Sequence, residues 1–595
     1  MVCSMIHSGA RARLAARAFT CASLLLIVHP ARGQEKTFIR LIVPETDTVQ
    51  TASSTYRLSA CTAPGSALSL NGRSLKVYSS GGCAGLLDLA VGENPFTLSA
   101  AGPGVARASK TFLVVRTPPP QSSPETPVQI DTMMMEPSRE LWLAEGDRLE
   151  VQFKGSPGCT ASCDLGIAMS ELPAGEAGTL RGIYHGSYTV RAADTLSLRR
   201  ITFTLRSPAG DSAVAASRAR VSYRNDFPLV GLTQGDRPAL AYGIGEDRLG
   251  GAKMSVIGSG IRLAIAGRNG PLYKVALAPA REAWISTENV ELLPKNARPP
   301  SAITENFTVY GDDKFDYVTV NVPAKLPWAS STEANPSRIH VDLFGAMVNS
   351  NWIIQQLNTR EITNVSYSVP SARTIRITIE LRHKQIWGYE VSYNGAGLVI
   401  KVRRQPERLK IKALTFALDA GHGGSNFGAL GSTGAKEKDV NLSVVRRLKA
   451  ILEDRGARVV LTRDSDSDMT SADRARRVIA SGADILISLH SNSCGLTSNP
   501  LDTRGTATFY KHLCYRSLTL AVLNQVLKTG LPLYGNVGSF NFALNSPTEL
   551  PSVLLEMAFI SNPEEEIKLL DPDFQQRIAE RVVDGIDDFL DQCND

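Results

Sequence analysis

The sequence predicts a multidomain protein in which several N-terminal all-β modules precede an α/β domain with a mostly parallel or mixed sheet. At 595 residues the chain is too long for a single hydrophobic core. Up to about residue 405, short apolar runs alternate with turns rich in Gly, Pro and Ser, which is typical of β-sandwiches and barrels. From about residue 411, strands alternate with helices, which indicates an α/β sheet.

Residues 1–33 have the order of a secretory signal peptide. Three arginines precede an apolar stretch from Ala18 to Val28, and small residues follow up to an expected cleavage after Gly33. A membrane anchor is disfavoured because about eleven apolar residues are too few to span a bilayer, which requires roughly twenty. We therefore expect an exported protein without a transmembrane segment, located in a periplasm or outside the cell.

The first β module is expected at residues 36–116, where four short apolar runs are separated by turn residues. Its segment 71–100 resembles the immunoglobulin-like domains of bacterial surface proteins. The proline-rich sequence TPPPQSSPETP follows and is expected to form a stiff, exposed spacer. A second β-sandwich is expected after it, at residues 128–225.

Cysteine usage agrees with export. Cys61 lies near Cys83 in the first module and Cys159 near Cys163 in the second, and we expect each pair to form a disulfide. A metal site at CTASC is the alternative for the second pair, although no further cysteine pair or histidine accompanies it. The net charge of +6 is too weak to indicate nucleic acid as a partner, and it is compatible with an anionic polymer.

Two further β modules are expected before the α/β domain. Residues 228–295 are dense in glycine and resemble a small bacterial SH3-like barrel, which either holds a ligand or is purely structural. Residues 303–405 alternate apolar and polar side chains, as in KFDYVTVNVPA, and are predicted to form a β-sandwich with a binding or targeting role.

The α/β domain is expected at residues 411–593. Its first strand spans 411–418, and a glycine-rich loop follows. In the helix after this loop the apolar residues fall on one face, and Gly456 ends the helix. Further strands are expected at 457–462, 484–490, 505–510 and 552–559, and further helices at 471–482, 515–529 and 572–591.

Four residues at the ends of these elements suit metal-assisted catalysis. His422 follows the first strand, His490 ends the strand 484–490, and Glu437 lies at the end of the glycine loop. Two imidazoles and one carboxylate are a usual ligand set for catalytic zinc, which keeps one position for water. Glu556 lies within the apolar strand SVLLEMAF, where a carboxylate is costly unless it is paired or functional. Taken singly, each histidine has a structural alternative, and Glu437 would also favour a helix start.

Several motifs occur in the order and approximate spacing of one family. They are LDAGHGGSNFGALGSTGAKEKDVNLSVV, TRDSD with RARRVIASGADILISLHSN, GTATFY, and ELPSVLLEMAFISNPEEEIKLL. Through them the α/β domain resembles the zinc-dependent N-acetylmuramoyl-L-alanine amidases of bacterial cell walls. The resemblance implies Zn²⁺ on His422, Glu437 and His490, with Glu556 as the catalytic general base and acid.

The resemblance further implies hydrolysis of peptidoglycan at the amide between the lactyl group of N-acetylmuramic acid and L-alanine, in wall remodelling or daughter-cell separation. Two alternatives stay open: a catalytically inactive wall-binding or adhesion protein, and a zinc peptidase that cuts the stem peptide. The second lacks support because His422 is followed by Gly-Gly-Ser instead of the His-x-x-Glu pair of many zinc peptidases. We expect a monomer; a divisome or activator protein stays possible, and none is identified.

Two details of the family pattern bear on regulation and targeting. Residues 303–405 are reminiscent of the β-sandwich that precedes the catalytic domain in some of these amidases. Some cell-separation amidases carry a long helical insertion after the GTATFY strand that covers the zinc site. Here only about forty residues separate Tyr510 from Pro551, so we expect the site to lack such an insertion.

Overall fold

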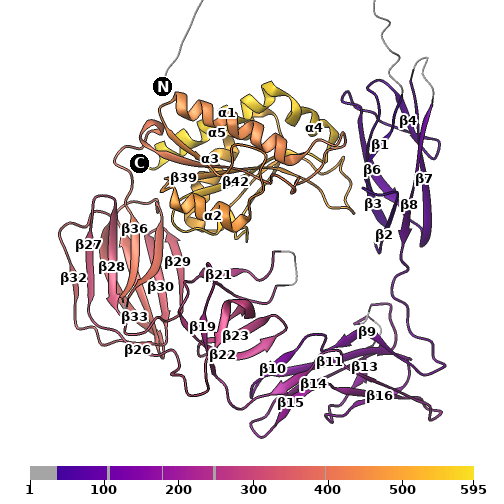
Figure 1. Cartoon of the computed structure of the whole chain (residues 1–595), viewed down its shortest axis with the longest axis horizontal. Coiled ribbons are helices and arrows are strands. Elements are labelled where there is room, and N and C mark those ends of the chain that lie inside the picture. The colour runs from indigo at the N-terminus through magenta and orange to yellow at the C-terminus, as the bar shows by residue number, and fades with distance from the viewer. Residues whose placement is uncertain are drawn as a thin grey trace, which may run out of the picture.

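The structure, a computed structural model, describes residues 37–594 except positions 103–106, 174, 177, 246–248 and 396. Strand-rich regions precede one C-terminal domain that contains the α-helices of the described chain (Figure 1). This arrangement confirms the predicted fold class in its coarse form. The predicted signal peptide, residues 1–33, lies outside the described residues. No helix in the described part of the chain is long and apolar enough to cross a membrane.

The first β region forms two sheets, with strand orders β1-β3-β6 and β2-β8-β7-β4-β5. Its core contains alternate residues of the strands, such as Leu98 with Ala100 and Phe112 with Val114, because successive side chains of a strand point to opposite faces. The strands are β1 (Arg40–Val43), β2 (Thr48–Thr51), β3 (Thr55–Cys61), β4 (Ala67–Leu70), β5 (Arg73–Leu75), β6 (Gly82–Asp88), β7 (Gly92–Ala101) and β8 (Ala108–Arg116).

The second β region contains a sheet of order β13-β14-β11-β9 and a sheet of order β12-β16-β17. Its strands are β9 (Ile130–Glu136), β10 (Leu141–Leu143), β11 (Arg148–Gly155), β12 (Thr160–Cys163), β13 (Ser170–Glu171), β14 (Ile183–Thr189), β15 (Leu196–Arg199), β16 (Thr202–Arg206), β17 (Ser212–Ala216) and β18 (Val221–Tyr223).

The third β region continues a sheet of the second. Strand β10 pairs antiparallel with β22, so that Trp142 lies opposite Arg268, and β15 and β18 extend the same sheet. The second and third predicted modules are therefore joined by backbone hydrogen bonds. The third region comprises β19 (Leu229–Thr233), β20 (Ala239–Ala241), β21 (Lys253–Val256), β22 (Arg262–Asn269), β23 (Leu272–Ala278), β24 (Arg281–Ser286), η1 (Thr287–Asn289) and β25 (Val290–Leu292).

The fourth β region contains sheets of order β32-β27-β28-β36-β35 and β29-β30-β34-β33, with the short pair β26-β31. Its strands are β26 (Ala302–Ile303), β27 (Phe307–Gly311), β28 (Phe315–Asn321), β29 (Trp328–Ala334), β30 (Ser337–Phe344), β31 (Ala346–Met347), β32 (Ile353–Gln355), β33 (Ile362–Ser371), β34 (Thr374–Leu381), β35 (Tyr389–Asn394) and β36 (Gly397–Arg403).

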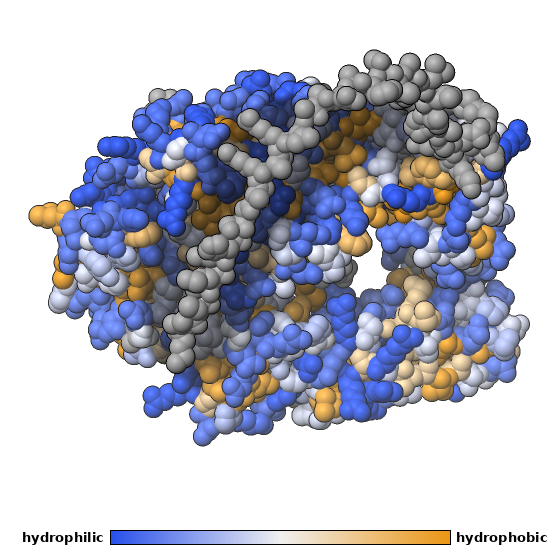
Figure 2. Space-filling view, turned by 45° about the horizontal axis from the view of Figure 1, so that its top comes forward, coloured by the Kyte–Doolittle hydropathy of each residue, from blue (hydrophilic) through white to orange (hydrophobic). Residues whose placement is uncertain are grey.

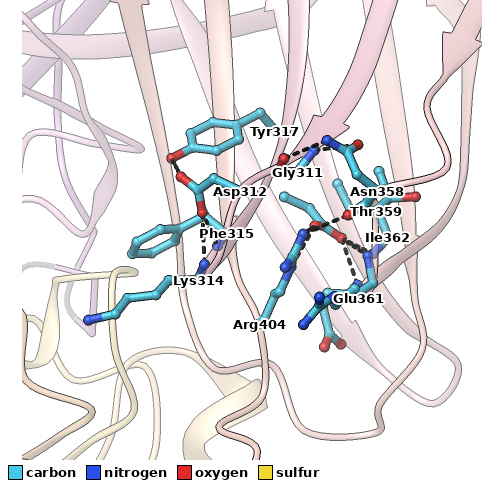
Figure 3. A network of polar contacts seen from close by, with 12 residues as sticks. Gly311, Asp312, Lys314, Phe315, Tyr317, Asn358, Thr359, Glu361, Ile362 and Arg404 are labelled. Carbon is cyan, nitrogen blue, oxygen red and sulfur yellow. Dashed lines mark hydrogen bonds and ion pairs between the residues drawn. The ribbon is translucent and has the colours of Figure 1, made fainter.

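A buried carboxylate organises one end of the fourth region. Asp316 of β28 accepts hydrogen bonds from the backbone N–H groups of Arg360, Glu361 and Ile362, at 2.6–2.9 Å. The guanidinium of Arg404, which follows β36, donates to the same carboxylate at 2.8 Å (Figure 3). The hydrogen bonds compensate for the burial of the Asp316 charge. Through them Asp316 connects residues 360–362 to the segment that leads into the α/β domain.

The α/β domain is built on a six-stranded sheet of order β38-β37-β39-β42-β40-β41, in which β40 runs antiparallel to β42. Helices α1, α3 and α5 cover one face and α2 the other (Figure 1). The elements are η2 (Ile411–Ala413), β37 (Thr415–Ala420), α1 (Glu437–Asp454), β38 (Arg458–Leu461), α2 (Ser471–Ala480), β39 (Ile485–Asn492), β40 (Thr506–Phe509), η3 (Leu513–Tyr515), α3 (Arg516–Val526), η4 (Leu527–Thr529), β41 (Leu533–Val537), η5 (Ala543–Asn545), β42 (Ser552–Phe559), α4 (Pro563–Leu570) and α5 (Pro572–Gln592).

The predicted first strand of this domain was wrong at its start. Residues Ile411–Ala413 form a 3-10 turn, in which the Leu414 N–H bonds the Ile411 carbonyl, and the strand begins only at Thr415. An apolar run does not distinguish a buried turn from a buried strand, which explains the error. Helix α1 ends as predicted, with Gly456 in the left-handed conformation (φ 82°) just beyond it.

The predicted disulfides are absent, since all seven cysteines of the described residues are free. Cys61 lies opposite Gly82 and Cys83 opposite Ala60 in the β3–β6 pair. Residues directly opposite each other share a face, so Cys61 and Cys83 point to opposite faces of the sheet. Cys159 directly precedes β12 and Cys163 ends it, so the two cysteines are four positions apart. In an extended chain this is about 13 Å, which exceeds the reach of a disulfide.

The first β region returns to contact the α/β domain, so that the chain surrounds an opening that is visible in the space-filling view (Figure 2). The Arg57 side chain, 6% exposed, donates at 2.9 Å to the Ser493 hydroxyl and at 2.8 Å to the Cys494 carbonyl. The Arg57 backbone N–H donates to the Leu496 carbonyl at 2.6 Å. These contacts hold the first region against the loop that follows β39.

Candidate metal centre and active-site cavity

His422 lies in the glycine-rich loop between β37 and α1, and its own φ of 62° is in the left-handed region. Two glycines of this loop are required by close approach. A Cβ at Gly421 would lie 2.3 Å from the His490 ring. A Cβ at Gly428 would lie 2.5 Å from the Glu437 carboxylate and 2.7 Å from the His422 ring. The glycines therefore let the loop fold tightly around these three side chains.

Three predicted ligand residues meet at the carboxyl ends of β37 and β39. Glu437 Oε1 is 3.2 Å from His422 Nε2 and 3.1 Å from His490 Nδ1. One ligand atom of each residue lies within 4.8 Å of the other two. The imidazole rings stand edge to face at 5.1 Å, and His422 Nδ1 is 3.0 Å from Asn426 Oδ1. That second contact leaves His422 Nε2 directed at the shared centre.

Glu437 is the first residue of α1 and is 5% exposed. Its Oε2 accepts a hydrogen bond from the Ala429 N–H at 2.7 Å, which closes the glycine loop. Its Oε1 accepts from the Ser491 N–H at 3.1 Å and from the Asn441 side chain at 3.3 Å. Backbone and side-chain donors thus fix one carboxylate oxygen at the point where the two imidazoles converge.

The electrostatics of the cluster follow from burial and from the mutual contacts of its groups. Burial opposes ionisation of Glu437, but the contacts with His422 and His490 hold its pKa well below the usual range. Burial opposes protonation of His490, but the Glu437 contact and the charge of Glu556 raise its pKa to about 9. The site therefore favours a bound positive charge, which a divalent cation supplies in competition with protons.

A buried carboxylate beneath the cluster positions the loop. Asp419, the residue that leads into the glycine loop, accepts hydrogen bonds from the Thr462 hydroxyl at 2.6 Å and the Ser488 hydroxyl at 2.7 Å. Arg474 of α2 donates to it at 2.7 Å. Burial alone would raise the pKa of Asp419, but the charge of Arg474 and the other contacts outweigh burial and hold this pKa below its ordinary value.

Two buried arginines bind the loop backbone. Arg474 donates to the carbonyls of Ala420 at 2.7 Å and of His422 at 2.6 Å. Arg463 donates to the carbonyls of Ala420 at 2.9 Å and of Gly421 at 3.1 Å. Arg463 is 3% exposed and Arg474 is 5% exposed. They satisfy carbonyl groups that the turn leaves without a partner in the sheet, and so hold the backbone that carries His422.

A cavity of about 570 Å³ opens over the cluster. It is lined by His422, Glu437 and His490, and by Glu556 of β42, which is 9% exposed. Glu556 lies opposite His490 in the parallel β39–β42 pair. The Phe542 ring also lines the cavity, with its centroid 6.3 Å from that of His490. The structure therefore brings all four residues selected from the sequence to one cavity.

Two imidazole nitrogens and one carboxylate oxygen at this spacing suit zinc or a similar divalent transition metal. The roles of Asp419, Arg463 and Arg474, which hold the loop, were not predicted from the sequence. Both arginines lie in motifs that carry the family resemblance, TRDSD and RARRVIASG. No local pattern indicates their role, because the carbonyl groups that they bind lie 42–54 residues away in the sequence.

The family model described as N-acetylmuramoyl-L-alanine amidase (Amidase_3) matches residues 417–588. A protein of Bacillus subtilis (strain 168), "Uncharacterized protein YqiI", is 34% identical over 31% of this chain and 87% of its own length. "N-acetylmuramoyl-L-alanine amidase AmiC" of Escherichia coli O6:H1 is 31% identical over 29% of this chain. The chain spans 52% of the length of that enzyme.

Solved structures match the same part of the chain. The catalytic domain of CwlV, an N-acetylmuramoyl-L-alanine amidase from Bacillus (Paenibacillus) polymyxa var. colistinus, is 34% identical, with a TM-score of 0.28. The match covers 30% of this chain and 98% of that domain. The amidase AmiC2 of Nostoc punctiforme is 30% identical over 30% of this chain and 97% of its own, also with a TM-score of 0.28.

Proposed function

Because this chain belongs to the N-acetylmuramoyl-L-alanine amidase family and is an enzyme of that class, we propose that it hydrolyses peptidoglycan. The bond cleaved joins the lactyl group of N-acetylmuramic acid to the L-alanine of the stem peptide. One observation carries this proposal: the cluster of His422, Glu437 and His490 lies with Glu556 in a single cavity of the matched domain.

His422, Glu437 and His490 are proposed to hold a zinc ion. The contact with Asn426 directs His422 Nε2 at the centre, and Oε1 of Glu437 lies 3.2 Å from that nitrogen and 3.1 Å from His490 Nδ1, so these three atoms would bind the metal. Zinc bound there would polarise the amide carbonyl and lower the pKa of a bound water toward about 7. The three residues contribute a single negative charge, so the site stays cationic overall when a divalent ion binds.

Glu556 is proposed to move the proton. Its carboxylate takes a proton from the attacking water and delivers it to the alanine nitrogen as the amide bond breaks. Support comes from its place on β42, opposite His490, at the wall of the same cavity. Its position in an otherwise apolar strand agrees with a role that requires a carboxylate there.

The course of the chain between β40 and β42 supports the expectation that no inserted helix has to be removed before substrate can enter the cavity. Helix α3, the α-helix of this connection, packs on α5, where Val522 approaches so closely that only glycine fits at position 585. Only the short η5 segment with Phe542 reaches the cavity. We therefore expect basal activity from the purified chain without an activator.

The proposed setting is the bacterial cell wall, where the exported protein would act in remodelling or daughter-cell separation. The test is digestion of purified sacculi by the full chain, followed by mass analysis of the soluble fragments. An amidase releases stem peptides with a free L-alanine amino terminus and leaves the glycan strands without peptide. Cuts within the stem peptide would instead identify a peptidase.

The variant Glu556→Gln is the matched inactive form. We expect it to lose about 10²–10⁴-fold in activity while it retains zinc and binds sacculi, because only the proton carrier is removed. Metal analysis of both proteins checks that the variant differs in chemistry and not in loading. A wild-type chain that binds sacculi but releases nothing would identify a wall-binding protein, and equal release by both forms would refute the role of Glu556.

A further inference from the structure

A second cavity, of about 440 Å³, lies where three parts of the chain meet. Its walls come from residues 235–261 of the third β region, residues 325–330 and 390–393 of the fourth, and residues 511–512 and 546–549 of the α/β domain. This volume is in the range of small-ligand sites, and junctions between domains are common places for them. We call this space the junction cavity.

Basic side chains gather at the junction cavity. Lys511 and Arg237 line it, and Lys253 of β21 lies close enough to both for mutual repulsion. Burial, together with the charge of Lys253, lowers the pKa of Lys511 to about 8. Burial and the charge of Arg237 likewise lower the pKa of Lys253.

The acidic side chains of the cavity do not offset these lysines. Glu549 lies 3.9 Å from Arg237, its nearest cationic side chain, and burial raises the pKa of Glu549. Asp236 pairs at 3.1 Å with Arg476 of α2. Glu390 is the remaining acid of the wall. Within the described part of the chain, neither the Lys511 nor the Lys253 ammonium has a hydrogen-bond or ion-pair partner.

A half-buried ammonium without a partner is unfavourable, and two such groups that repel each other are more so. An anion bound in the cavity would supply the missing partner through charge-assisted hydrogen bonds. We propose that the junction cavity binds an anionic ligand through a carboxylate or phosphate group, which pairs with Lys511 and Arg237 of its wall. This site is separate from the catalytic cavity and does not depend on the proposed reaction.

The ligand would also connect the domains. The wall segment 546–549 continues the chain from Phe542 and Leu544, which line the catalytic cavity. Asn541, next to Phe542, donates to the Gly251 carbonyl of the third β region at 3.0 Å. An anion that pairs with Lys511 of the α/β domain and Arg237 of the third region therefore stabilises the contact that the same loop already makes.

The test uses the full chain and the variant Lys511→Met, with Lys528→Met as control because Lys528 is exposed on η4 of the same domain. Two probes distinguish the sources of the anionic group: inorganic phosphate, and a soluble stem peptide prepared from sacculi. Titration calorimetry measures binding, and thermal unfolding measures stability. We expect at least one probe to bind the wild type and K528M, and to bind K511M about tenfold more weakly or worse.

Without a probe, K511M should unfold at a higher temperature than the wild type, because the substitution removes an unpaired charge from a half-buried position. Binding of the peptide alone would assign a wall-derived carboxylate, and binding of phosphate alone a phosphate ligand. A lower unfolding temperature for K511M, or no binding of either probe to the wild type, would overturn the proposal. The variant Glu556→Gln should bind the probe normally, so a failure of the amidase proposal is distinguishable from a failure of this one.

Discussion

At the scale of single residues, one oxygen atom organises the proposed metal centre. Oε1 of Glu437 faces both imidazoles and is fixed by the Ser491 N–H and the Asn441 side chain. Glutamine, the neutral isostere of glutamate, would keep the length of the Glu437 side chain but replace its carboxylate by an uncharged amide. The charge, and not the shape, is therefore what the substitution tests.

We expect Glu437→Gln to weaken zinc retention by more than about 100-fold, since it alters a ligand and not merely a group that orients one. Zinc content after dialysis against a chelator, and release of peptides from sacculi, should fall together. Glu453→Gln is the control, because Glu453 lies at the far end of the same helix and pairs with Lys449 at 2.6 Å. Full zinc occupancy in E437Q would remove Glu437 from the ligand set.

Lys511 leads to a prediction about pH. In the folded chain its pKa is about 8, against an ordinary value of 10.5, because of burial and then Lys253. Between pH 8 and 10.5 the unfolded chain therefore binds more protons at this lysine, and its contribution to stability rises with pH. The other charged or titratable groups that face it across the cavity are Arg237, Lys253, Lys325, His512, Asp236, Glu390 and Glu549.

The excess in unfolding temperature of K511M over the wild type should thus be largest below pH 8 and shrink toward pH 10.5. Thermal unfolding across this range measures it, with K528M as the reference for titration elsewhere in the chain. A difference that stays constant with pH would show that the folded protein does not depress the pKa of Lys511.

At the scale of elements, the glycine loop is the feature that joins β37 to α1 in the required shape. Gly428 has φ 70°, and a Cβ there would overlap Glu437 and His422. Gly482 has a similar φ of 64°, but a Cβ there would meet nothing within 4 Å. The two glycines separate the cost of the left-handed backbone from the cost of the steric overlap.

We expect Gly482→Ala to lower the free energy of unfolding by about 1 kcal/mol, the cost of left-handed alanine. Gly428→Ala should lower it by about 1–3 kcal/mol more and should weaken zinc binding, because the added methyl displaces two ligand side chains. Denaturant unfolding and zinc competition with a chelator measure these effects. Equal behaviour of the two variants would show that the loop has room for the methyl group.

Element boundaries were predictable where a local signal exists. The end of α1 at Asp454 is encoded by Gly456, and the strand SVLLEMAF by its run of apolar residues. Strand β41 and helix α4 were not predicted. The segment LYGNV has little apolar pattern, whereas Asn562 before Pro563 is a local signal for the start of α4.

At the scale of the whole molecule, the first β region closes the chain onto the α/β domain. Arg57 contacts Ser493 and Cys494, only three and four residues beyond His490. Arg40 donates to the Thr433 carbonyl, in the segment between His422 and Glu437. Both segments that carry the proposed metal ligands therefore border the first region, which makes this contact a test of the overall arrangement.

Arg57→Ala leaves the Cys494 carbonyl without this donor in a buried contact, which should cost about 1–3 kcal/mol of docking free energy. We expect a larger radius of gyration by small-angle scattering and faster hydrogen exchange in residues 493–497. Arg73→Ala is the control, since Arg73 is exposed on β5. Unchanged scattering and exchange in R57A would mean that the remaining contacts suffice to hold the first region.

The sequence by itself determined the strand-rich regions, the α/β domain and the choice of four residues that meet in one cavity, because hydrophobic periods and the His-Gly motif are local patterns. Tertiary structure alone decided what depends on partners distant in sequence. Cys61 and Cys83 are adjacent in space, yet their register places them on opposite faces. Arg463 and Arg474 hold the His422 loop, and Lys511 meets Lys253, through contacts that no local pattern encodes. Packing of distant segments creates these neighbours, and their burial gives them their chemistry.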